Sequence, residues 1–95
     1  MAEPQEVAVT EEGTDLHSED GKFDAHIRAE KDPEGVHQIT VDVFDSRVRD
    51  NNRAHVDSEL FDNTNQGAAD AEDYLLGYGF RYRVREMRGP GGVAL

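Results

Sequence analysis

The sequence predicts an α+β domain in which one helix covers one face of a four-stranded sheet. Apolar and polar residues alternate over 23–30, 36–44 and 53–61, which is the two-residue period of half-buried strands. The period becomes helical over 63–76 and returns to two residues over 80–85. The predicted order is therefore βββαβ, an antiparallel meander followed by a helix and one crossover strand.

The first two predicted strands form a hairpin. Between them lies the tetrapeptide 32–35 (Asp-Pro-Glu-Gly), in which proline presets φ at the second turn position and glycine suits the last. The strand before this turn places one apolar set on one face: Phe23, Ala25, Ile27 and Ala29. The strand after it is rich in β-branched residues, as expected of a central strand, with a second set facing the same way: Ile39, Val41 and Val43.

The third predicted strand follows a turn at 49–52, where asparagine and aspartate tolerate left-handed dihedrals. Phe44 falls out of phase with Val43, which indicates a β-bulge or the start of this turn. The alternation predicts four core-facing residues: Ala54, Val56, Ser58 and Leu60. It predicts four outward residues: Arg53, His55, Asp57 and Glu59.

The predicted helix begins at Asn63, which can cap it together with Gln66 in a capping box. Gly77 and Gly79 provide the C-terminal stop. Helical spacing defines its packed face: Ala68, Ala71, Glu72, Leu75 and Leu76. A right-handed crossover then sets the strand 80–85 parallel to the first strand, which predicts the strand order 3-2-1-4.

The ends of the chain are expected to lie outside this domain. Residues 1–21 are acidic and show no usable period, so we expect a disordered tail. A single domain then spans 22–88, and the glycine-rich 89–95 is a flexible C-terminal tail. The chain has no cysteine and no apolar run long enough to span a bilayer, and its N-terminal residues are not expected to act as a secretory signal. A cytoplasmic protein without membrane contact is expected.

The net charge of −11 is unevenly distributed. Residues 1–20 contain seven acids and no Lys or Arg, whereas 81–95 contain four Arg and one acid. So acidic a chain repels nucleic-acid phosphate and favours basic partners, which makes direct nucleic-acid binding an unfavoured function. The acid excess also fits a salt-adapted host.

No catalytic or metal site is predicted. His55, Asp57 and Glu59 have the residue types of metal ligands, with His26 and Asp42 nearby, but a flat exposed sheet offers no desolvated cage. The same exposure argues against carboxyl groups whose pKa values are shifted for acid–base catalysis. The glycine pair 77/79 follows the helix and so cannot cradle a phosphate at a helix N-terminus. We expect no cofactor and no enzymatic activity.

Three arginines on the last predicted strand, Arg81, Arg83 and Arg85, share one face and would repel one another unless neutralised. One interpretation is that Asp24 and Glu30 of the first strand neutralise them. The other is that they form a basic stripe for phosphate or for an acidic partner. The overall charge disfavours the phosphate reading.

The stretch 61–80 (FDNTNQGAADAEDYLLGYGF) runs from a strand through a cap and a short acidic helix to a glycine stop and a strand. In this layout, over 23–86, and in its acid excess, the chain resembles small phage-encoded accessory proteins that include anti-CRISPR inhibitors. The resemblance implies a protein that blocks a host nucleic-acid-handling machine by occupying its basic surface.

These observations predict a non-enzymatic protein-binding module, with carboxylates that engage Lys or Arg on a partner. The expected partner-binding residues are Asp42, Asp57, Glu59, Arg81, Arg83 and Arg85. Two alternatives stay open: a nucleic-acid-binding or regulatory protein that uses the arginine strand, and a salt-adapted housekeeping protein whose acids serve solubility alone. A homodimer is also left open.

Overall fold

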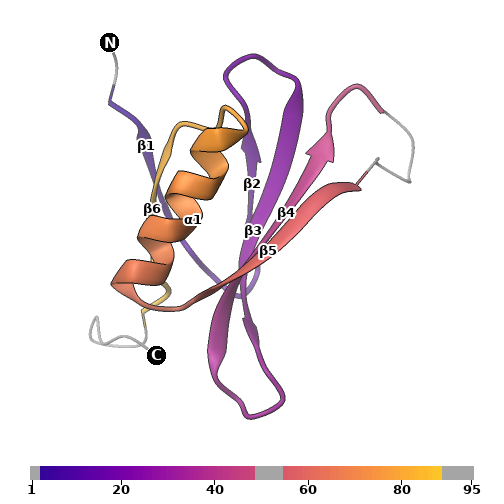
Figure 1. Ribbon diagram of the computed structural model, residues 1–95. Helices are drawn as coiled ribbons and strands as arrows, with labels where there is room; N and C mark the ends of the chain where they lie inside the picture. The colour runs from indigo at the N-terminus through magenta and orange to yellow at the C-terminus, as the bar shows by residue number, and fades with distance from the viewer. Residues whose placement is uncertain (1–2, 49–54, 89–95) are drawn as a thin grey trace.

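The computed structural model describes residues 3–48 and 55–88 (Figure 1). Its elements are β1 (Gln5–Ala8), β2 (Thr14–His17), β3 (Phe23–Lys31), β4 (His37–Asp45), β5 (His55–Asp62), α1 (Asn65–Gly77) and β6 (Tyr82–Arg85). Strands β2-β3-β4-β5 form an antiparallel sheet in that order, and β1 pairs with β6 in parallel. The α+β class is confirmed. The expectations for the turn at 49–52, for Arg53 and Ala54, and for 89–95 lie outside the described residues.

The β3–β4 hairpin forms as expected. Its register sets Ala25 opposite Val43 and Ile27 opposite Val41, and all four side chains are buried. In the connecting turn, the Asp32 carboxylate accepts hydrogen bonds from two backbone N–H groups further along the turn, at 2.9 Å each. The predicted alternation of β3 and β4 therefore gives the central part of the sheet.

The phase predicted for β5 is wrong beyond its first residue. Asp57 lies opposite Val43 but His55 lies opposite Phe44, so Val56 is an extra residue in a β-bulge. Because side chains alternate, Ser58 and Leu60 lie on the outer face of the sheet, whereas Asp57, Glu59 and Phe61 lie on the helix side. Leu60, expected in the core, is 57% exposed.

The expectation of a disordered N-terminal tail is wrong for the residues that the structure describes. Val7, Val9 and Leu16 are 5%, 2% and 1% exposed and belong to the hydrophobic core. Their side chains are few but fall at strand spacing, and burying them outweighs the cost of ordering the acids between them. The domain thus begins within 1–21, well before residue 22.

The predicted strand order is also wrong, and for the same reason. Strand β2 pairs with β3 through Leu16 and Ala25, so it occupies the sheet edge that was expected to receive the last strand. Strand β6 pairs instead with β1, with Val84 opposite Val7. Figure 1 shows this parallel pair behind the helix and apart from the larger sheet.

Helix α1 begins one residue later than predicted. Thr64 is the N-cap, and its hydroxyl accepts a hydrogen bond from the Gly67 N–H at 2.9 Å. Asn63 is buried and instead bonds the Met87 backbone twice: its amide donates to the carbonyl at 3.0 Å and accepts from the N–H at 2.7 Å. At the other end, Gly79 takes a φ of 91°, so the predicted glycine stop is confirmed.

The core lies between α1, the β1–β6 pair and one face of the sheet. The helix buries Ala68, Ala71 and Leu75, and Phe80 just after it is fully buried. Helix α1 contacts both β5 and β6, so it joins the two sheets (Figure 1). No helix in the described ranges has the length and apolar character needed to cross a bilayer.

Candidate partner-binding surface

Strand β5 and helix α1 form one of two strongly acidic parts of the fold, the other being the N-terminal segment 3–20. Residues 55–80 contain no Lys or Arg and carry six acids: Asp57, Glu59, Asp62, Asp70, Glu72 and Asp73. They thus account for −6 of the net charge of −11. Where these carboxylates point decides whether the fold or a partner neutralises them.

Asp57 joins β5 to the helix through two tyrosines. Its Oδ2 accepts the Tyr74 hydroxyl at 2.8 Å and the Tyr78 hydroxyl at 3.1 Å. These two hydrogen bonds lower the pKa of Asp57. Burial, with the adjacent carboxylate as a further cause, raises the pKa of Tyr74 well above its usual range. Asp57 is therefore held ionised mainly by two neutral hydroxyl donors.

A chain of aromatic contacts surrounds this carboxylate. The ring of Tyr78 lies 5.3 Å from Phe23 and 5.5 Å from Tyr74, and Tyr74 lies 5.7 Å from Phe61. The rings meet edge-on or tilted, an arrangement that favours aromatic pairs. All four are partly buried against the core. They form a semi-rigid band between the helix and β5.

Three further acids border the aromatic band. Glu59 lies between Asp57 and Phe61 on the helix side of β5, and Asp70 lies one turn before Tyr74. Asp73 is the exposed neighbour of Tyr74. Together with Asp57 we call these residues the β5–α1 acidic surface. In the part of the chain that the structure describes, no ion pair joins any of the four to Lys or Arg.

The other acids of this region point elsewhere. Glu72 accepts the Val84 N–H at 2.8 Å, so it fastens the helix to β6. Asp62 lies at the end of β5. Two leucines of this region are exposed, Leu60 on the outer face of β5 at 57% and Leu76 on the helix at 55%.

Asp42, the third predicted acid, lies on the opposite, outer face of the sheet. Burial raises its pKa, but hydrogen bonds from Arg28 and Ser58 outweigh this, and the net shift is downward. The Arg28 guanidinium donates to its carboxylate at 2.6 Å and also to Glu30. The structure therefore separates Asp42 from Asp57 and Glu59, and it neutralises Asp42 internally.

The residue types that resembled metal ligands are likewise split between the two faces. The bulge leaves His55 on the outer face, against the Phe44 ring at 5.6 Å, while Asp57 and Glu59 face the helix. Over residues 3–48 and 55–88, no group of three His, Asp or Glu side chains is placed to hold a metal ion.

The three predicted arginines lie on β6 or just before it, and the expectation that they share the outer sheet face is wrong. Arg85 lies 3.4 Å from Glu6, Arg81 lies 3.7 Å from Glu19, and Arg83 is opposite Glu6 in the register. The neutralising carboxylates thus come from the N-terminal segment. Asp24 and Glu30, which were expected in this role, contact His17 and Arg28 instead.

Sequence reasoning missed the tyrosine pair as the support of Asp57. A signal was present, because Tyr74 and Tyr78 are four residues apart and so share a helix face. The bulge at Val56, which turns Asp57 toward these tyrosines, has no comparable signature in the sequence. Comparison with protein-family models, curated proteins and solved structures finds no match to this chain.

Proposed function

We propose that this chain is a non-catalytic protein-binding module that presents the β5–α1 acidic surface to a basic patch on a partner protein. One observation carries the proposal. Of the two acidic regions of the chain, the N-terminal one meets Arg and His within the fold, whereas Glu59, Asp70 and Asp73 meet no cation among the described residues.

The composition of the surface supports this role. Carboxylates around a band of tyrosine and phenylalanine offer charge complementarity at the rim and apolar area at the centre. Because the band is packed, little side-chain freedom is lost when a partner binds. Strand β5 is also the last strand of its sheet, so its outer edge can accept an added strand.

The resemblance to phage-encoded inhibitors adds a narrower version of the proposal. In that version the partner is a host nucleic-acid-handling complex, whose basic surface the acidic surface occupies. A cytoplasmic location belongs to the same version.

Nucleic-acid binding through β6 is the second candidate. Arg83 is exposed, and the arginines of β6 form one row, which favours it. However, Glu6 and Glu19 already lie at two positions of that row, and their charges repel phosphate.

Affinity capture followed by binding kinetics tests the proposal. The double variant Glu59→Lys/Asp73→Lys reverses two charges of the acidic surface. Its matched control, Glu3→Lys/Glu34→Lys, makes the same net change at two exposed acids elsewhere. We expect the first variant to lose the captured partner and the control to retain it, with a wild-type association rate that falls steeply with salt.

Equal loss in both variants would show that net charge alone matters and would contradict the proposed surface. Steep, salt-dependent binding of duplex DNA or RNA, lost on Arg83→Gln, would favour the second candidate. If no partner is retained at low salt, the acids serve solubility and the protein-binding proposal fails.

A further inference from the structure

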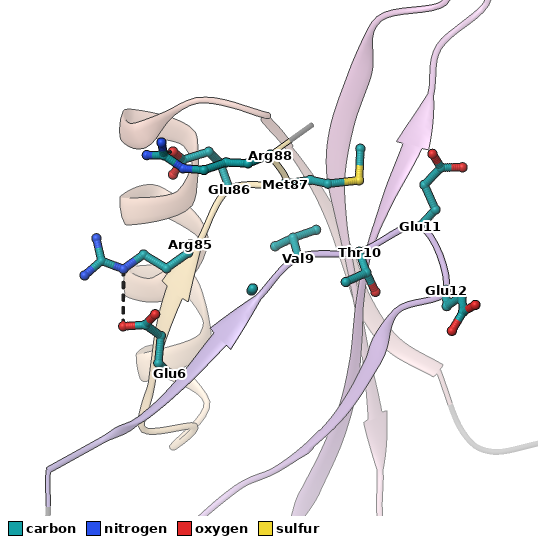
Figure 2. Close-up of a pocket in the computed structure, with 10 residues that line it drawn as sticks. Glu6, Val9, Thr10, Glu11, Glu12, Arg85, Glu86, Met87 and Arg88 are labelled. Atoms are coloured by element: carbon teal, nitrogen blue, oxygen red, sulfur yellow. Dashed lines mark ion pairs between the residues drawn. The ribbon is translucent and has the colours of Figure 1, made fainter. Parts of the chain in front are cut away.

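An open groove lies at the end of the molecule where β1 and β6 finish (Figure 2). Its volume is about 920 Å³. Residues 8–12 form one wall and residues 85–88 the other. Figure 2 shows Val9 and Met87 near the middle of the two walls, with Glu11 and Glu12 at one end and the Glu6–Arg85 pair at the other. The groove thus has an apolar middle and charged ends.

A tight turn fixes the acidic end. The Thr10 hydroxyl accepts the Gly13 N–H at 3.0 Å, and the Thr10 carbonyl accepts the Ala29 N–H at 2.9 Å. Gly13 has a φ of 88°, which strains any other residue, and a Cβ there would lie 2.3 Å from the His26 ring and force that ring to move. The turn is therefore held against β3, and Glu11 and Glu12 project from a fixed backbone.

The arginines of the groove are already engaged. Arg85 lies 3.4 Å from Glu6, and Arg88 lies 2.6 Å from Glu86. Glu86 is 4% exposed, so this second pair is part of the wall. With these two pairs neutral, Glu11 and Glu12 leave the groove a charge of −2.

A largely buried histidine lies beside the acidic end of the groove. The His37 side chain is only 10% exposed, and its Nε2 has no hydrogen-bond partner in the described structure. This nitrogen lies 3.4 Å from the Glu11 carboxylate, close enough for an ion pair but without hydrogen-bond geometry. This contact places His37 next to Glu11 but outside the residues that line the groove, so the acidic end of the groove consists of Glu11 and Glu12.

We propose that the groove binds an arginine side chain of the basic partner. The proposal rests on the proposed function and names a second, more specific contact within it. The aliphatic stem lies along Val9 and Met87, and the guanidinium reaches Glu11 and Glu12. Arginine fits because its planar group carries five N–H donors, enough for both carboxylates.

Titration with a short peptide tests the groove directly. The probe is acetyl-Gly-Leu-Arg-Leu-Gly-amide, and its control replaces arginine by citrulline, which has nearly the same shape and no charge. We expect saturable NMR shifts at residues 8–12 and 86–88 and at His37. The citrulline peptide should bind at least about tenfold more weakly, since it loses its charge-assisted hydrogen bonds. Equal binding of the two peptides would overturn the proposal.

Two variants separate this groove from the acidic surface. Glu11→Gln/Glu12→Gln should weaken the arginine peptide by about tenfold or more, whereas Glu59→Gln/Asp73→Gln should leave it within about twofold. The reverse pattern, or shifts confined to β5 and α1, would overturn the groove and leave the proposed function standing. Partner capture that fails in the Glu59→Lys/Asp73→Lys variant, with peptide binding intact, would support both.

Discussion

Two parts of this chain have the same bias in sequence and opposite fates in the fold. Residues 3–20 and residues 55–80 each contain six or seven acids and no Lys or Arg. In the first part, four acids contact cationic or titratable partners: Glu6 and Glu19 meet arginines, and Glu11 and Asp15 meet histidines. In the second part, the carboxylates meet tyrosine hydroxyls, amides or solvent.

The comparison shows that acid content alone does not define a tail or a binding surface. The N-terminal part is held in place by a few apolar side chains, and its charges then pair with β6 and β3. The β5–α1 part packs against the arginine strand β6 on one side of the helix only, and over the described residues none of its acids Asp57, Glu59, Asp70 and Asp73 forms an ion pair with Lys or Arg. A surplus of like charge on an ordered surface is the feature that a partner can use.

Truncation of residues 1–18 has the largest expected effect and tests whether the N-terminal part belongs to the folded domain. It removes both N-terminal strands and the burial of Val7, Val9 and Leu16. Each such side chain contributes about 1.5 to 3 kcal/mol, and a small domain has roughly 5 to 15 kcal/mol in total. We expect the truncated chain to lose its cooperative thermal transition by circular dichroism. An unchanged melting midpoint would contradict this and support the prediction that the N-terminal segment is disordered.

A single substitution sharpens the same point. Leu16→Ala should lower the free energy of unfolding by about 2 to 5 kcal/mol, because the side chain is 1% exposed. The control Leu76→Ala removes the same atoms from a helix position that is 55% exposed and should change it by less than about 0.5 kcal/mol. Chemical denaturation measures both, and similar values for the two would contradict the described core.

The tyrosine support of Asp57 predicts a pH effect in the β5–α1 part. In Tyr74→Phe/Tyr78→Phe, the pKa of Asp57 should rise toward its ordinary value of 3.8, since the two hydrogen bonds that lower it most are gone. A lowered pKa in the folded state stabilises the fold above the unfolded value, and this stabilisation is lost as pH falls through the folded value.

The variant should therefore be less stable than wild type at neutral pH, and the difference should shrink below about pH 4. NMR titration of the Asp57 carboxyl group and denaturation across this range measure it. If the stability difference between wild type and variant stays constant from neutral to acidic pH, the hydroxyls stabilise the fold independently of the ionisation of Asp57.

The smallest effect concerns the N-terminal ion pairs. Glu6 and Arg85 are 59% and 53% exposed, so Glu6→Gln should change the free energy of unfolding by only about 0 to 1 kcal/mol. High salt should reduce even this difference. A larger loss would mean that charge pairing, and not burial of Val7 and Leu16, anchors the N-terminal part.

The sequence predicted the α+β class, the β3–β4 hairpin and the glycine stop because each depends on local spacing or turn chemistry. It failed where long-range pairing decides. Leu16 pairs with Ala25 and Val84 pairs with Val7, and neither contact can be read from a segment taken alone. For the candidate surface, Asp57 and Glu59 were predicted on the outer face of the sheet, and the bulge at Val56 places them on the helix side instead.

Mapping the local electrostatic potential tests the central claim most directly. Amide relaxation is measured by NMR with a cationic and with an anionic nitroxide cosolute, and the ratio of the two effects reports the potential at each residue. We predict a strong excess of the cationic probe around Glu59, Asp70 and Asp73, and a clearly smaller excess around Glu6 and Glu19. Equal ratios in the two regions would contradict the account, because they would mean that the fold neutralises both acidic parts alike.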